Sequence, residues 1–221
     1  MIAKRGVLWD MDGVLVDTGE FYFQAWSQIL SEYDIPFTKE LFQNTFGMNN
    51  AGILSSLLGY TPAPDFLAEI GDRKERRFRQ AVRGRAQPLP GVRFWLGRLQ
   101  AAGWPQAIAS SAPQANIDAL VDELGLRSYF AALVSGADLP GKPEPTLFLK
   151  VASRIDVMPR RCVVVEDAVA GVEAARRAGM KCVAVTTTNP ASALEGADVI
   201  VERLDDLAPD TFECLLAGAE V

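Results

Sequence analysis

The sequence feature that most constrains the fold is a regular alternation of short apolar runs with helical patterns along the second part of the chain. The apolar runs are residues 107–109, 131–134, 162–165 and 181–185, with a weaker one at 198–201 and one near the start at 7–9. The helical patterns span residues 92–102, 114–124, 146–155 and 171–178. Strands that are apolar throughout are buried on both faces, because right-handed crossovers place helices on both sides of a parallel sheet. The sequence therefore predicts an α/β fold with a Rossmann-like parallel sheet.

The stretch between residues 17 and 87 follows a different pattern. It carries no strand candidate, and its apolar residues recur at helical spacing. The helical segments are residues 20–33, 39–46, 51–58 and 65–83. We therefore expect a small all-helical domain at residues 18–86, inserted into an α/β core domain made of residues 1–17 and 87–221.

The first apolar run ends in two acids. Asp10 and Asp12 are followed by Gly13, which lets the backbone turn sharply. If the extended geometry continues past Trp9, both carboxylates point the same way. Two anions held together in a partly dry place need a cation or a shared proton. For an isolated pair, an ordinary turn with a solvated aspartate is the commoner explanation.

The composition excludes several classes of catalysis, metal binding and partner. The chain has no histidine, which removes Ser-His and Cys-His catalysis, histidine-bound zinc and imidazole acid-base catalysis. A net charge of −6 disfavours a nucleic-acid surface, and no apolar run approaches the ~20 residues that span a bilayer. Cys162, Cys182 and Cys214 fit small hydrophobic residues in a reducing compartment. We therefore expect a cytoplasmic protein that binds neither membranes nor nucleic acid.

Polar side chains also follow the other apolar runs. They are Ser110 and Ser111 after residues 107–109, Lys142 in the loop after residues 131–134, and Glu166 with Asp167 after residues 162–165. Taken singly, a serine here could cap a helix, and a loop lysine is usually solvated. However, ligands of parallel sheets bind at the carboxyl ends of the strands. Two acid pairs at that edge are difficult to explain as solubilising charge.

Four carboxylates without histidine or a positioned cysteine make an oxygen-only site. Such a site suits a hard cation, for which Mg²⁺ is the natural choice. With a lysine and a hydroxyl group beside it, the site suits phosphoryl transfer, which depends on positioning and charge compensation. A carboxylate can itself attack phosphorus.

Together these segments resemble the haloacid dehalogenase (HAD) superfamily. DMDGVLVDT, ASS, GKPEP and VVEDAVAGVEAARRAG are similar to its four motifs in order, and the helical insert is similar to its small helical cap. The similarity is greatest to the β-phosphoglucomutase-like phosphatases, over about residues 5–205. The resemblance implies the HAD fold and a magnesium-dependent phosphatase. It would hydrolyse a small phosphate monoester, expected to be a sugar phosphate, through an aspartyl-phosphate intermediate.

The resemblance also implies roles for the first acid pair. Asp10 would be the nucleophile and a metal ligand. Asp12 would protonate the leaving oxygen, activate the hydrolytic water and bind the metal through its backbone carbonyl. We expect its pKa to be raised for this task, which burial under a closed cap could achieve.

The remaining motifs would bind phosphate and metal. By the same resemblance, Ser110 would hold a phosphate oxygen, with Ser111 beside it as a candidate for substrate contact. Lys142 would bridge the nucleophile and the phosphate. Glu166 and Asp167 would complete the metal site.

Departures from the family pattern bear on the reaction. Family dehalogenases lack an acid at the Asp12 position, so phosphoryl transfer is favoured. The hexose-phosphate mutases carry a histidine where this chain has Tyr22, and an arginine near Asn50 that grips a distal phosphate; both groups are missing here. Hydrolysis is therefore favoured, with β-phosphoglucomutase-type isomerisation as the alternative. A non-catalytic phosphate- or metal-binding module is a more distant one.

The helical insert contains the candidates for substrate contact outside the four motifs. They are Thr18, Tyr22, Asn50 and Lys74. Lys74 belongs to a basic run at residues 73–85, most of which we interpret as a solvated helix face, but it matches a family position that points toward the active site. The expected partner is a small phosphorylated metabolite, and the expected state is a monomer, with a homodimer as the alternative.

Overall fold

The computed structural model describes residues 4–45 and 50–217. Among these residues, 4–17 and 86–217 form one compact unit, and 18–45 with 50–85 form a second. Ala86, at the predicted end of the helical domain, is buried in the α/β unit. Within the described ranges, none of the helices combines the length and the apolar character that a membrane span requires.

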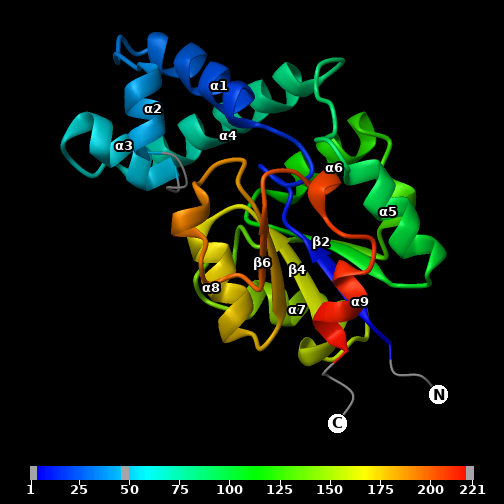
Figure 1. Cartoon of the computed structure of the whole chain (residues 1–221). Helices are drawn as coiled ribbons and strands as arrows, with labels where there is room; N and C mark the ends of the chain where they lie inside the picture. Colours follow the sequence, from blue (N-terminus) through cyan, green and yellow to red (C-terminus); the bar gives the residue numbers. More distant parts are fainter. Residues whose placement is uncertain (1–3, 46–49, 218–221) are drawn as a thin grey trace. The chain divides into compact units, whose positions relative to one another are not determined.

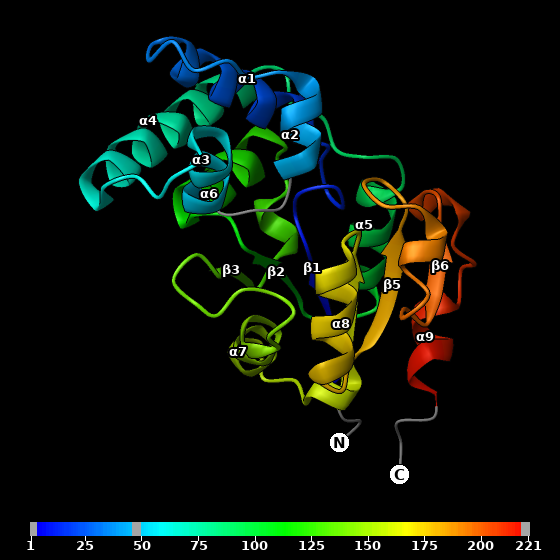
Figure 2. The same cartoon turned by 90° about the vertical axis from the view of Figure 1, so that its left-hand side faces the viewer.

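The α/β unit is built on a six-stranded sheet whose strands are all parallel. The strands are β1 (Gly6–Trp9), β2 (Gln106–Ser110), β3 (Ala132–Ser135), β4 (Cys162–Glu166), β5 (Lys181–Val185) and β6 (Val199–Val201). Their order in the sheet is β3-β2-β1-β4-β5-β6 (Figures 1 and 2). The predicted α/β fold with a parallel sheet is therefore confirmed. The chain order reverses between β1 and β4, and parallel sheets bind ligands at such switch points.

Helices cover both faces of this sheet. They are α5 (Val92–Ala101), α6 (Gln114–Glu123), α7 (Thr146–Arg154), α8 (Val169–Arg177) and α9 (Thr211–Leu216), and single 3-10 turns lie at Arg127–Tyr129, Pro159–Arg161, Ala191–Ala193 and Leu204–Asp206. On one face, Leu8 packs in a core with apolar residues of α7 and α8. Figure 2 shows these two helices in front of the sheet. On the other, the ring of Trp9 lies 6.3 Å from that of Phe212 in α9, which lies 5.0 Å from Trp95 in α5. Consecutive side chains of β1 thus point to opposite faces of the sheet. Both faces are covered by helices, which explains why the strand is apolar throughout.

The described part of the second unit contains four helices. They are α1 (Gly19–Ser31), α2 (Lys39–Thr45), α3 (Asn50–Leu58) and α4 (Pro64–Val82). Residues 18–45 and 50–85, the part of this unit that the structure describes, contain no strand. Apolar faces of α1, α3 and α4 meet in a core that includes Trp26, Leu30, Leu54 and Ile70. Residue 46, the predicted end of the second helix, lies outside the described residues.

Among the described α-helices, α9 is the one that the sequence patterns do not predict. It spans six residues, of which Phe212 and Leu216 are buried. A single pair of apolar residues four apart is too short a pattern to distinguish a helix from a loop. The predicted helices and strands occur in the structure, and their described ends coincide with the predicted ones or differ by one or two residues, as helix ends commonly do.

Candidate active site

The register of the sheet brings the first and fourth motifs together. Trp9 of β1 pairs with Val165 of β4, and the backbone N–H of Asp10 donates to the carbonyl of Val165 at 2.9 Å. The next residue of each strand path is therefore an acid, Asp10 on one side and Glu166 on the other. Both lie at the carboxyl edge of the sheet, at the point where the strand order reverses.

Three carboxylates meet at this edge. Asp10, Glu166 and Asp167 each contribute one oxygen to a group whose members lie within 4.8 Å of one another. Their exposed fractions are 6%, 0% and 4%. Carboxylates buried this closely repel one another unless cations compensate them.

Lys142 supplies part of that compensation. It belongs to the loop between β3 and α7, and its side chain is only 11% exposed. Its ammonium group donates to Oδ1 of Asp10 at 2.5 Å and also contacts Oε1 of Glu166. Burial alone would lower the pKa of Lys142, but the negative charges of Asp10 and Glu166 raise it above its ordinary value. This lysine is therefore a charged, buried bridge and not the solvated side chain typical of loops.

The carboxylate of Glu166 is fixed from its other side by the backbone. Its Oε2 accepts hydrogen bonds from the N–H groups of Asp167 at 2.9 Å and Ala168 at 3.0 Å, directly before α8. A Cβ atom on Gly171, in the first turn of this helix, would collide with the same carboxylate. The motif therefore needs a small residue at position 171, because Glu166 fills the space that a side chain there would occupy.

A tight turn after β1 carries the second acid. The N–H of Gly13 donates to the carbonyl of Val16 at 2.8 Å, and Gly13 has a φ of +79°. A Cβ atom on Gly13 would also overlap the carboxylate of Asp167. Asp12, directly before it, is half-buried, and its charge raises the pKa of both Asp10 and Asp167, so it acts on the cluster electrostatically.

Burial disfavours the ionised form of the carboxylates in this cluster. It raises the pKa of Asp10 well above its ordinary value, opposed by Lys142 and assisted by Glu166 and Asp167. It also raises the pKa of Asp167 to about 7, with Glu166 adding to the effect and Thr188 opposing it. Three carboxylates and one ammonium group leave two negative charges uncompensated when all are ionised. An oxygen-only set with this excess charge fits a divalent hard cation.

Two further residues contact the cluster, and sequence reasoning missed them. Thr188 donates from its hydroxyl group to Oδ2 of Asp167 at 2.6 Å, and Asn189 donates to the backbone carbonyl of Asp167 at 3.0 Å. Both belong to the loop after β5. The polar sequence TTTN directly after that strand is the signal that could have found them, because β5 ends at the same edge of the sheet.

The serines of the second motif lie at the end of the neighbouring strand. Ser110 is the last residue of β2, beside β1, and is 1% exposed. Its Oγ accepts the N–H of Ala112 at 3.1 Å, which leaves the hydroxyl hydrogen available as a donor. The helix α6 begins later, at Gln114, with no side-chain cap. Ser111 is exposed.

Two of the candidates in the helical unit lie together. The ammonium group of Lys74 is 4.9 Å from the ring centroid of Tyr22 and 5.4 Å from that of Trp26, and 2.5 Å from Oε1 of Glu75. The Tyr22 ring stacks on Phe78 at 4.0 Å. Lys74 is 5% exposed and so differs from the solvated face that we expected for most of the basic run.

The other two candidates lie at helix starts. Thr18 is 1% exposed and directly precedes α1 without capping it through its side chain. Asn50 is the first residue of α3, and its side-chain amide lies 3.0 Å from the position that a Cβ atom on Gly71 would take.

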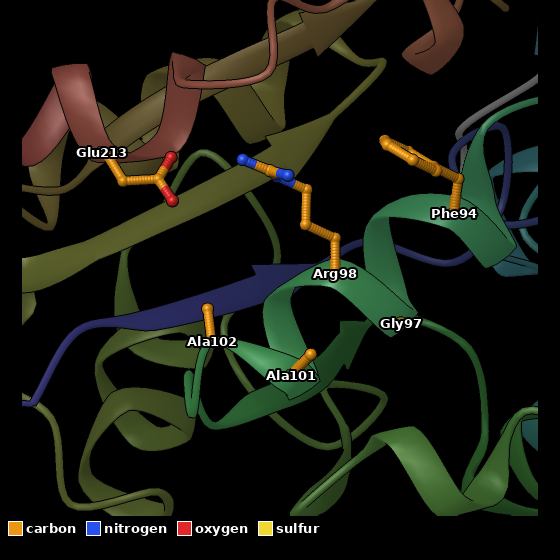
Figure 3. Close-up of a pocket in the computed structure, with 6 residues that line it drawn as sticks. All are labelled: Phe94, Gly97, Arg98, Ala101, Ala102 and Glu213. Atoms are coloured by element: carbon orange, nitrogen blue, oxygen red, sulfur yellow. The ribbon is translucent and has the colours of Figure 1, made fainter.

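A separate cavity of about 490 Å³ lies between α5 and α9. Figure 3 shows Arg98 and Glu213 extending toward each other across it. Its lining residues are Phe94, Gly97, Arg98, Ala101, Ala102 and Glu213. Because α5 ends shortly before β2 begins, its last turn lies toward the amino edge of the sheet. This cavity is therefore distinct from the acid cluster.

Comparisons with known proteins show what the chain is similar to. A model of haloacid dehalogenase-like hydrolases matches residues 4–179. The chain is 33% identical over 214 residues to β-phosphoglucomutase of Bacillus subtilis, covering 92% of this chain and 91% of that protein. It is also 33% identical over 178 residues to a phosphorylated carbohydrates phosphatase of Thermotoga maritima, covering 80% of this chain and 82% of that protein. A solved HAD family hydrolase from Deinococcus radiodurans, with bound phosphate and sodium, has a TM-score of 0.73 at 29% identity, covering 98% of both chains.

Proposed function

Because the chain belongs to the haloacid dehalogenase-like hydrolase family, we propose that it is a magnesium-dependent phosphatase that hydrolyses a small sugar phosphate through an aspartyl-phosphate intermediate. The observation that carries the proposal is the bridge from Lys142 to Asp10 and Glu166 inside a buried acid cluster. A cation fixed between two buried carboxylates at a sheet edge is suited to stabilise charge that moves during phosphoryl transfer.

The proposed reaction has two steps. The carboxylate of Asp10 attacks phosphorus and forms the aspartyl phosphate, while the bond from phosphorus to the ester oxygen breaks and Asp12 protonates the leaving alcohol. Asp12 then takes a proton from a water molecule, which attacks phosphorus and releases inorganic phosphate and the free carboxylate of Asp10. Lys142 balances negative charge on Asp10 and on the phosphate, and the Ser110 hydroxyl donates to a phosphate oxygen.

The residues present fit Mg²⁺. The carboxylates of Asp10, Glu166 and Asp167 would hold it, and the family resemblance adds the backbone carbonyl of Asp12. When bound, the ion supplies charge compensation for the carboxylates and for the phosphoryl group. The excess negative charge of the cluster and the oxygen-only donor set support this assignment.

Two departures from the mutase pattern favour hydrolysis over isomerisation. Tyr22 stands where the mutases carry histidine, and its ring stacks on Phe78. No arginine accompanies Asn50 in the sequence to grip a distal phosphate. The second candidate function remains β-phosphoglucomutase activity, which is favoured by the 33% identity to the Bacillus subtilis enzyme over 92% of this chain.

We propose that four residues of the helical unit contact the substrate: Thr18, Tyr22, Asn50 and Lys74. Ser111 of the second motif is a fifth proposed contact. Lys74 has the strongest support, because a buried ammonium group next to two aromatic rings is held in place. Phosphorylated carbohydrates are the proposed substrate class, supported by the name of the Thermotoga maritima relative.

We also propose a cytoplasmic monomer without membrane or nucleic-acid partners. The three cysteines form no disulfide in the structure, which fits a reducing compartment. Size-exclusion chromatography with light scattering would separate this monomer from a homodimer.

The test is a phosphate-release screen over sugar phosphates and other phosphate esters with Mg²⁺, run beside an assay of β-glucose 1-phosphate isomerisation. We expect release of phosphate from sugar phosphates, and its loss in an Asp10→Asn variant. Conversion to glucose 6-phosphate faster than phosphate release would establish the mutase instead. Binding of phosphate or Mg²⁺ without turnover of any ester would establish the non-catalytic module.

A further inference from the structure

The loop that follows β5 supports Asp167 through a small hydrogen-bond network. The hydroxyl group of Thr188 lies 2.6 Å from Oδ2 of Asp167 and 3.1 Å from its backbone oxygen. The side-chain amide of Asn189 donates to the same backbone oxygen and to the hydroxyl oxygen of Thr188, both at 3.0 Å. Two consecutive residues therefore contact one acid of the cluster at both its backbone and its side chain.

Donor and acceptor roles fix the direction of this network. A hydroxyl group has one hydrogen to donate, and Thr188 Oγ1 already accepts from Asn189. Its hydrogen therefore goes to the nearer acceptor, Oδ2 of Asp167. The hydrogen bond to Oδ2 therefore fixes the orientation of the Asp167 carboxylate.

No local structural task accounts for these contacts. The 3-10 turn that follows begins at Ala191, and no side chain caps it. Thr188 as a residue is exposed, and its hydrogen bonds to Asp167 are only partly buried, so they do not belong to the hydrophobic core. Its methyl group lies 3.1 Å from the position that a Cβ atom on Gly13 would take, which seats the side chain against the turn after β1.

We propose that Thr188 is a positioning residue of the metal site, which holds the Asp167 carboxylate in the orientation that a divalent cation requires, and that Asn189 orients the Thr188 hydroxyl group. The inference rests on the proposed metal site. Residues that orient metal ligands typically change metal affinity about 10–100-fold when they are replaced.

The experiment measures Mg²⁺ binding directly, by isothermal titration calorimetry on metal-free protein at a pH of about 8 or above, where the carboxylate, whose pKa is raised to about 7, is ionised. A Thr188→Val variant keeps the shape and loses the hydroxyl, and we expect its Kd for Mg²⁺ to rise about 10-fold or more. Thr188→Ser keeps the hydroxyl, and we expect its Kd to stay within about 3-fold of the wild type. Thr187→Val, at the exposed neighbouring position, is the matched control and should leave the Kd unchanged.

The outcomes separate this inference from the proposed function. A Thr188→Val protein that binds Mg²⁺ with the wild-type Kd would overturn the role of Thr188, while phosphate release by the wild type would still stand. Failure of the wild-type protein to bind Mg²⁺ would overturn both. A Thr188→Ser variant as weak as Thr188→Val would also contradict the inference, because the hydroxyl group would then not be what matters. Thermal melting of each metal-free variant shows whether all of them are folded.

Discussion

The ammonium group of Lys142 lies 2.5 Å from Oδ1 of Asp10, although 132 positions separate the two residues in the chain. The contact joins the loop after β3 to the end of β1, across the intervening strand β2. It converts a lysine that would be solvated in an isolated loop into the fixed positive charge of an acidic site. Its consequences can be measured.

Replacing Lys142 with Met should lower kcat/KM for phosphate-ester hydrolysis by at least about 100-fold, since a fixed charge near the reacting group contributes on this scale. Lys150→Met, on the exposed side of α7, is the matched control and should retain full activity. The measurement is steady-state hydrolysis with saturating Mg²⁺. Near-normal kcat/KM in Lys142→Met would remove this residue from the proposed mechanism.

Replacing Gly171 with Ala should reduce activity and stability, although Ala is ordinarily the better helix former. The new Cβ atom would displace the Glu166 carboxylate, and overpacking of this kind typically costs about 1–3 kcal/mol. Gly97→Ala in α5 provides the control, because nothing lies within 4 Å of its Cβ position, and it should stabilise by up to about 1 kcal/mol. Denaturant unfolding measures whether the free energy of unfolding falls in Gly171→Ala and rises in Gly97→Ala. Stabilisation of both variants would show that the Glu166 carboxylate moves away at no cost.

The stability of the metal-free protein should fall as the pH rises through about 7. Burial raises the pKa of Asp167 to about 7, so the folded chain binds this proton more tightly than the unfolded chain does, and the stability gained from it is lost above that pKa. Mg²⁺ binds the ionised carboxylate, so the increase in Tm that it produces should grow over the same range. Melting curves between about pH 5.5 and pH 8.5, with chelator or with Mg²⁺, measure both trends.

In an Asp167→Asn variant, the stability and the Tm increase caused by Mg²⁺ should both depend much less on pH. Asp138→Asn, at an exposed position of the α/β unit, should keep both pH dependences. A Tm increase with Mg²⁺ that does not depend on pH would place the bound ion away from Asp167.

Replacing Lys74 with Met should raise KM for a sugar phosphate about 10-fold while changing the hydrolysis of a phenyl phosphate much less. The sugar phosphate would lose its contact with Lys74, whereas the phenyl phosphate makes no such contact to lose. Met retains most of the apolar stem that packs with Tyr22 and Trp26. Arg76→Met, at an exposed position of the same helix, is the control. Equal effects on both substrates would argue against a specificity role.

Most of the architecture could be predicted because it depends on local patterns. Continuous apolar runs predicted the parallel strands, and four motifs predicted the family and a HAD-like phosphatase enzyme. These three predictions are confirmed. The helix α9 was missed because six residues carry too little periodicity.

The site could be predicted only in part. Asp10, Glu166 and Asp167 follow or end apolar runs that predict strands, and Lys142 lies in the loop after another such run. Charged residues in these positions can be recognised in a sequence. Thr188 and Asn189 carry no charge, and hydroxyl and amide residues are ordinary in loops. The burial of Lys74 could not be predicted either, because it depends on aromatic rings of another helix.

By itself the sequence determined which residue types follow the predicted strands, and it therefore predicted an oxygen-only site at one edge of a parallel sheet. Only the tertiary structure decided which of those residues meet. The pairing of β1 with β4 sets Asp10 beside Glu166. The loop after β3 brings Lys142 to these two carboxylates, and the loop after β5 brings Thr188 to the neighbouring carboxylate of Asp167. The physical reason is that hydrophobic burial depends on residue type, whereas charge compensation and hydrogen bonding depend on distances that only the packed sheet defines.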